Sequence, residues 1–129
     1  NIIWYGNYFK YFEIARRKFL KKIKYDINDW KKTNCTWVIV ETNCKYLKPL
    51  SYDKNINILC LLEEFKYRLK FSYKIMDNSN KINYAKGFTI QVPIDDKGLH
   101  SKIHQVELIE KINKYKTNEY TRKTKIRKK

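Results

Sequence analysis

The hydrophobic period of the chain changes once, near residue 36, and this change constrains the fold more than any other feature. Before it, apolar residues recur at spacings of three and four, as on one face of a helix. These residues are Tyr8, Phe12, Ala15, Phe19 and Ile23. After it, apolar and polar residues alternate with a period of two, as in half-buried strands. The pattern predicts one amphipathic helix over Asn7–Lys24, followed by strands.

Four stretches have the composition and alternation of strands, namely 36–46, 55–65, 68–76 and 82–92. The second is apolar on both faces, which predicts a central position in the sheet. Short connections such as Asp77–Asn80 join the stretches, so neighbouring strands are predicted to be antiparallel.

The sequence also predicts which residues of the first strand share a face and where the fourth strand is irregular. In the first strand, the alternation predicts one shared face for Val38, Val40, Thr42, Cys44 and Tyr46. In the fourth, Gly87 interrupts the run, which indicates a bulge or the close approach of another segment.

The long apolar stripe of the helix has to be buried, and the only large apolar surface available is the sheet. We therefore predict an α+β domain over residues 1–112, in which an antiparallel sheet wraps one long helix. Leu99–Ile112 is predicted to be a short closing helix. The remaining residues, 113–129, form a basic tail without apolar periodicity, which predicts disorder.

The segment Asn1–Tyr8, with Tyr11–Glu13 and Ala15–Arg16 behind it, resembles the signature of the 4-hydroxybenzoyl-CoA thioesterase and related acyl-CoA thioesterases. The resemblance continues in three later segments and in the turn that holds Asp95 and Gly98. Those segments are Tyr46–Asp53, Phe71–Ile75 and Ala85–Gly87.

This resemblance implies the hotdog fold and the hydrolysis of acyl-CoA or acyl-carrier-protein thioesters to a free acid and a thiol. It implies no cofactor, and assembly as a homodimer or homotetramer.

Three positions depart from the pattern of the family. Asn1 stands where the family has Gly, and Lys18 replaces an acid that is common there. The family's catalytic Asp would fall three residues before Asn1, together with the strand that carries it. We therefore expect this chain to hydrolyse thioesters more slowly than one with that strand. The alternative is a non-catalytic hotdog module that binds acyl-CoA or assembles with partners.

The candidate catalytic residues are Tyr5, Asn7 and Glu13. The resemblance implies that the backbone N–H of Tyr5 faces the thioester oxygen, next to Asn7 at the start of the helix. Glu13 is the obvious internal carboxylate, but an ion pair with Arg16, three residues on, is the favoured explanation for it. As a base it is poorly placed, almost two turns into the helix.

The candidate substrate-binding residues fall in two groups. Trp4 and Tyr8 flank the expected thioester site. Lys66, Arg68 and Lys70 cluster at a strand turn, and the resemblance implies that they meet the phosphates of coenzyme A. Cations in an exposed turn are common in any case.

Other classes of function find little support in the sequence. Three cysteines without CxxC spacing argue against a disulfide framework or a zinc site, and predict a reducing compartment, the cytoplasm or an organellar matrix. His100 and His104 lack a nearby acid, so we expect exposed polar residues and no metal. The net charge of +16 favours anionic partners, but no nucleic-acid motif accompanies it. No stretch is long enough for a transmembrane helix.

Overall fold

A computed structural model describes residues 6–25, 29, 36–51, 53–98, 108–114 and 124–127. The order of elements is α1 (Gly6–Lys22), β1 (Thr36–Tyr46), β2 (Ile56–Glu64), β3 (Leu69–Asp77), β4 (Asn83–Ile94) and β5 (Thr124–Arg127). Residues 108–114 form a further short helix. The strands make one antiparallel sheet in the order β1-β4-β3-β2-β5. The predicted α+β class is confirmed.

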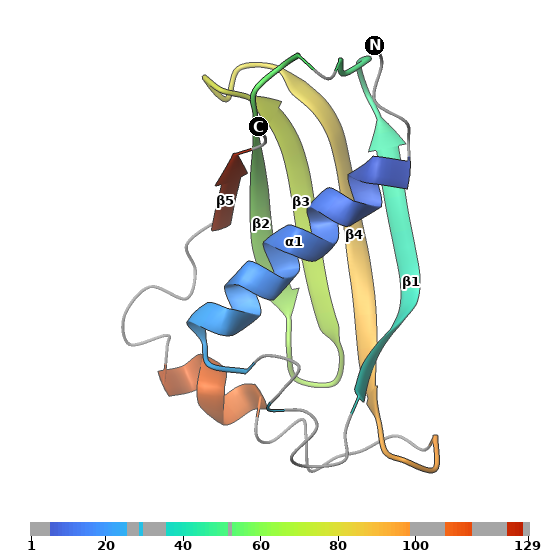
Figure 1. The fold of residues 1–129 in the computed structure, drawn as a ribbon. Helices are drawn as coiled ribbons and strands as arrows, with labels where there is room; N and C mark the ends of the chain where they lie inside the picture. The colour runs from blue at the N-terminus through green and yellow to red at the C-terminus, as the bar shows by residue number, and fades with distance from the viewer. Residues whose placement is uncertain are drawn as a thin grey trace.

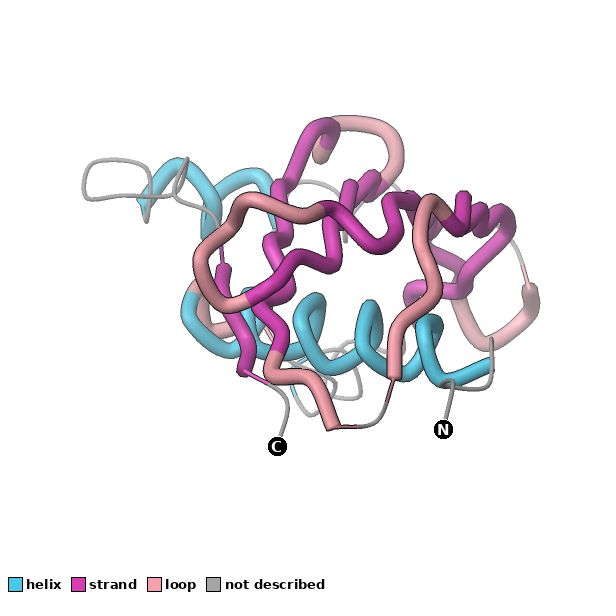
Figure 2. The backbone as a smooth tube through the Cα atoms, turned by 90° about the horizontal axis from the view of Figure 1, so that it is seen from above, coloured by secondary structure: helices cyan, strands magenta, loops and turns pink. Residues whose placement is uncertain are grey.

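Helix α1 lies diagonally across one face of the sheet (Figure 1), and the view from above shows the sheet curving over it (Figure 2). All five residues of the predicted stripe are buried. The ring of Phe12 stacks on Tyr73, with centroids 4.3 Å apart, and Phe19 meets the edge of Phe71 at 5.4 Å. These contacts give the predicted hotdog arrangement, a long helix held in a curved antiparallel sheet.

Gly87 lies where helix α1 and strand β1 both come close to the backbone of β4. A Cβ atom at this position would lie 2.2 Å from the carbonyl oxygen of Asn43 on β1 and 2.9 Å from Cε2 of Phe12 on α1. The pairing of Gly87 with both Cys44 and Tyr73 is regular. Of the two expectations for this glycine, the close approach is therefore confirmed, and there is no bulge at this residue.

The predicted face of β1 is correct for only half of the strand. Ile39 pairs with Gln91 and Glu41 pairs with Ile90, so Val40 is an extra residue in a β-bulge. Thr42, Cys44 and Tyr46 share the helix side of the sheet, as predicted. Beyond the bulge that side belongs to Trp37 and Ile39, and Val38 turns to the opposite face.

The far end of the core is closed by the short helix of residues 108–114, whose Leu108 and Ile112 are fully buried. This matches the predicted closing helix in kind, although residues 99–107 lie outside the described residues. The helix continues to residue 114 and β5 pairs with β2, whereas the disorder of the tail 113–129 stays a prediction. β5 pairs with β2 through backbone hydrogen bonds, and these do not require alternating apolar side chains in the tail. The domain boundary at residue 112 stays a prediction.

Candidate functional site

An open pocket of about 240 Å³ lies between α1 and the strands β1 and β4. Phe9 and Ile39 supply its apolar walls, and Thr42 and Thr89 supply hydroxyl groups. Three charged residues of α1 complete it: Lys10, Glu13 and Arg16. We call this pocket the helix–β1 groove. It combines apolar surface with a few polar groups, which is the usual make-up of a site for a small molecule.

Glu13 lies exposed at this groove, and it also lines a second hollow on the outer side of α1 with Arg17 and Lys21. Within the described part of the chain, no cation lies within ion-pair distance of its carboxylate. The alternative of an ion pair between Glu13 and Arg16 is therefore wrong. The guanidinium group of Arg16 turns into the core instead, away from the helix surface.

Arg16 is 7% exposed, and its Nη1 atom donates a hydrogen bond of 3.3 Å to the hydroxyl oxygen of Tyr73. That hydroxyl also shares a hydrogen bond of 2.6 Å with Oγ1 of Thr89. Burial raises the pKa of Tyr73 to about 12, so it stays a neutral phenol at physiological pH. Arg16 and Thr89, which both line the groove, are thus linked through the buried hydroxyl group of Tyr73.

Sequence reasoning did not assign Arg16, Tyr73 and Thr89 to a site. A signal was present, because Phe9, Glu13 and Arg16 follow one another at spacings of four and three, beside the apolar stripe. Such a spacing predicts a second helix face that points toward the sheet, and two of its three members are charged.

The residues predicted at the start of the helix have different surroundings. Trp4 and Tyr5 lie outside the described residues. Asn7 is half-buried in the first turn of α1. Tyr8 is buried, and its ring meets the edge of Tyr46 at 4.9 Å, while burial raises the pKa of its phenol. The assigned roles of all four residues stay predictions.

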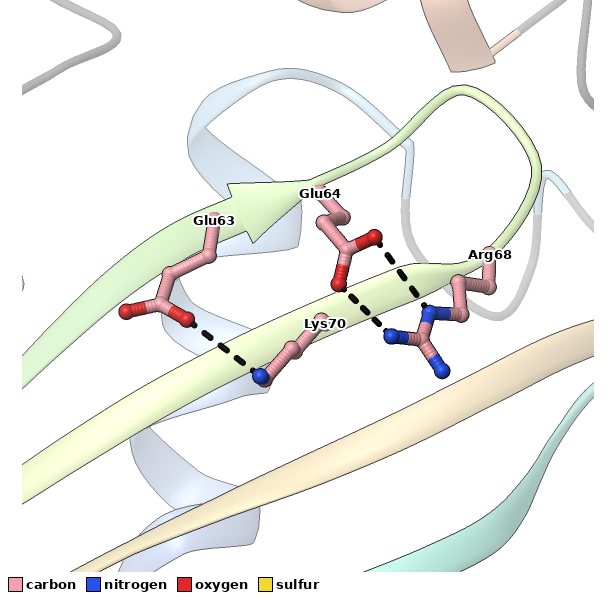
Figure 3. A network of polar contacts seen from close by, with 4 residues as sticks. All are labelled: Glu63, Glu64, Arg68 and Lys70. Carbon is pink, nitrogen blue, oxygen red and sulfur yellow. Dashed lines mark hydrogen bonds and ion pairs between the residues drawn. The ribbon is translucent and has the colours of Figure 1, made fainter.

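The predicted phosphate-binding cations lie on the β2–β3 hairpin, where Figure 3 shows Arg68 beside Glu64 and Lys70 beside Glu63. Lys66 and Arg68 line a hollow of about 410 Å³ there. Arg68 forms a two-pronged pair with Glu64, at 2.9 and 3.4 Å. Lys70 lies 3.7 Å from Glu63. Both pairs are open to solvent, so water and salt screen them and they hold the cations only weakly.

Two further expectations concern cysteine and metal chemistry. Cys44 and Cys60 are free thiols, and burial raises the pKa of each, which keeps them unreactive. Cys35, His100 and His104 lie outside the described residues. Over the described ranges, no group of His, Cys, Asp and Glu could hold a metal ion, and no helix is long and apolar enough to cross a membrane.

Comparison with known proteins gave three kinds of match. The family model described as "Thioesterase-like superfamily" matches residues 5–124. A curated protein of Aquifex aeolicus (strain VF5), described as "Putative esterase", is 34% identical over 73 residues, which cover 56% of this chain and 57% of that protein. The match thus spans little more than half the length of this relative.

Among the solved structures that share the fold are two from one organism. The DHNA-CoA thioesterase of Staphylococcus aureus has a TM-score of 0.75 at 20% identity, over 90% of this chain and 82% of that one. A hypothetical protein of Staphylococcus aureus, solved in complex with CoA, has a TM-score of 0.68 at 14% identity, over 83% of this chain and 72% of that one.

Proposed function

Since the chain belongs to the thioesterase-like superfamily, we propose that it hydrolyses acyl-CoA thioesters, or acyl-carrier thioesters, to a free acid and a thiol. The observation that carries this proposal is the helix–β1 groove, where a carboxylate, apolar walls and a buried cation meet beside α1. The acyl group would occupy the groove, and the nucleotide end of coenzyme A would lie toward the β2–β3 hairpin.

The start of α1 supports a role in polarising the thioester carbonyl. A helix N-terminus presents unpaired N–H groups and the positive end of the helix dipole. The first turn of α1 contains no acidic residue, so no side-chain carboxylate there competes for these donors. We propose that the backbone N–H of Tyr5, with Asn7 next to it, holds the thioester oxygen as negative charge develops on it.

Glu13 is the carboxylate that we propose as general base. It would take a proton from water as the water oxygen bonds to the thioester carbon. The C–S bond then breaks, the acyl group leaves as the acid, and the thiolate takes up the proton. The position of Glu13 at the groove, open to water and without an ion pair among the described residues, supports this role, since the base has to reach a water molecule.

The test is an assay of thiol release from a series of acyl-CoAs, on the chain and on its Glu13→Gln variant. We expect Glu13→Gln to lower kcat on the order of a hundredfold, because a general base commonly contributes that much. Glu110→Gln, which changes an exposed acid on the short helix, is the matched control and should leave kcat unchanged. Unchanged turnover in Glu13→Gln would exclude this base. Binding of acyl-CoA without any turnover would favour the non-catalytic module.

The hairpin ion pairs lead to a prediction for the CoA end. Glu64→Gln removes the partner of Arg68, whose hydrogen bonds also lower the pKa of Glu64. We expect CoA to bind about two- to fivefold more tightly to this variant, because its phosphates no longer compete with a carboxylate. Titration calorimetry measures the change, with Glu110→Gln as control. The gain should shrink as salt rises, and weaker binding would contradict a phosphate site at the hairpin.

We also propose assembly as a homodimer or homotetramer through β1. Among the described strands, β1 pairs only with β4, and it exposes Ile39, Val40 and Tyr46. An open edge with exposed apolar side chains is commonly covered by a second copy. We expect X-ray scattering at micromolar concentration to give at least the mass of a dimer. Val40→Lys should lower this mass toward that of the monomer. Ile14→Lys, on the outer face of α1, should leave the mass unchanged. A monodisperse unaltered monomer would contradict the proposal.

A further inference from the structure

The guanidinium group of Arg16 is a buried cation without a counter-ion among the described residues. It has five N–H donors, and its one hydrogen bond within that part of the chain goes to a neutral phenol, that of Tyr73. No carboxylate of the described residues lies within ion-pair distance of it. A charge that is taken out of water without a partner destabilises the folded chain, so a chain that keeps such a charge usually pairs it with an anion.

Arg16 is also accessible from one direction, because it lines the helix–β1 groove. Lys10, one and a half turns earlier on α1, adds a second positive charge at the same groove. Glu13 opposes them. Lys10 and Glu13 are both exposed, so water screens these two charges more than that of the buried Arg16. The electrostatic balance in the groove therefore favours an anion.

The other walls limit what kind of anion fits. Phe9 and Ile39 give the same groove apolar walls, so an anion that fills it has to be attached to an apolar spacer. The volume of about 240 Å³ is below the roughly 300–1,000 Å³ of pockets for larger ligands. A short acyl chain that ends in a carboxylate combines these properties.

We propose that the helix–β1 groove selects acyl groups with a carboxylate at the far end, which Arg16 binds through its remaining N–H donors. The inference rests on the proposed function, and names the substrate class of the same site. The apolar chain packs between Phe9 and Ile39, and the terminal carboxylate serves as the counter-ion of Arg16. A guanidinium group suits this task, because two of its N–H groups can meet both oxygens of one carboxylate.

The experiment compares two CoA conjugates that differ only at the far end. The probes are analogues of glutaryl-CoA and pentanoyl-CoA in which a methylene group separates the sulfur from the carbonyl carbon. These analogues have no thioester bond, so they cannot be hydrolysed. Titration calorimetry on the unaltered chain should show at least about tenfold tighter binding of the carboxylated analogue, as expected for a charge-assisted pair in a partly buried site. Equal affinities, or a preference for the pentanoyl analogue, would overturn the proposal.

Three variants assign the preference to Arg16. Arg16→Met keeps the length of the side chain and should remove the preference while the pentanoyl analogue still binds. Arg17→Met, at the exposed neighbouring position, is the matched control and should keep it. Lys10→Met should keep most of it, and complete loss there would move the site to Lys10 and overturn the role of Arg16. If Arg16→Met did not fold, the ratio of the affinities of the unaltered chain for the two analogues would still decide whether the carboxylate is selected.

The same samples separate this inference from the proposed function. Thiol release from glutaryl-CoA and pentanoyl-CoA reports on hydrolysis, and the binding ratio of the analogues reports on selection. Hydrolysis of both thioesters with equal binding would overturn the inference alone. A carboxylate preference without thiol release would support the inference and overturn the catalytic proposal alone.

Discussion

Gly87→Val is expected to destabilise the domain by at least about 3 kcal/mol, because added volume at this position has nowhere to go. The first atom of the new side chain would overlap the carbonyl oxygen of Asn43, which belongs to the backbone of β1. It would also press on the ring of Phe12, which is held between the helix and Tyr73. Either β1 separates from β4, or α1 lifts off the sheet.

Thermal unfolding followed by circular dichroism measures this effect, and the melting temperature should fall on the order of 10 °C. Gly98→Ala is the matched control. Gly98 has a φ of +79°, but a Cβ atom added there would meet nothing within 4 Å, so only backbone strain of about 1 kcal/mol is expected. Equal losses for the two glycines would mean that the close approach at Gly87 does not limit the fold.

Phe12→Ala is expected to cost about 3–5 kcal/mol, the usual range for the loss of a buried phenylalanine. The ring is fully buried, stacks on Tyr73 at 4.3 Å and meets the edge of Phe9 at 6.1 Å. Its removal leaves a cavity between α1 and the centre of the sheet, and the neighbouring strands cannot close it because their backbone hydrogen bonds fix their spacing.

Phe9→Ala provides the comparison for Phe12→Ala in chemical denaturation. Phe9 is on the same helix and 37% exposed, so its loss should cost about 1 kcal/mol or less. The two variants remove the same atoms, so the difference between their free energies of unfolding measures the effect of burying the ring. A smaller effect at Phe12 than at Phe9 would contradict the packing of α1 against β3.

The fold was predictable from the sequence because two strong periods define it. All five residues of the stripe predicted on α1 are buried, although the stripe left out Leu20 and Arg16. The alternation in β3 correctly predicted the burial of Phe71 and Tyr73. The face of β1 was predictable only up to the bulge. The extra residue Val40 reverses the alternation of faces on its far side. The sequence does not indicate this reversal, because a valine fits both a regular strand and a bulge.

The candidate site was less predictable, because long charged side chains have several possible partners. Spacing placed Glu13 and Arg16 within reach of each other, but Arg16 is long enough to reach Tyr73, which is 57 residues away in the chain. The same holds at the hairpin, where Arg68 and Lys70 were identified as cations but not as partners of Glu64 and Glu63. Such pairings depend on the register of strands, which local sequence does not define.

The extra residue in β1 also determines what can be added to the open edge of the sheet. Val40 divides this edge into two segments whose pleats are out of phase. A regular strand whose pleat matches that of Thr42–Tyr46 would not match the pleat of Thr36–Ile39. Along Thr36–Ile39, its side chains would point to the opposite face of the sheet from the side chains they pair with. Unrelated extended peptides, and stacked copies of the kind found in fibrils, are regular strands of this sort. The bulge therefore protects the chain from indiscriminate strand addition, and admits only a partner with a matching irregularity in one alignment.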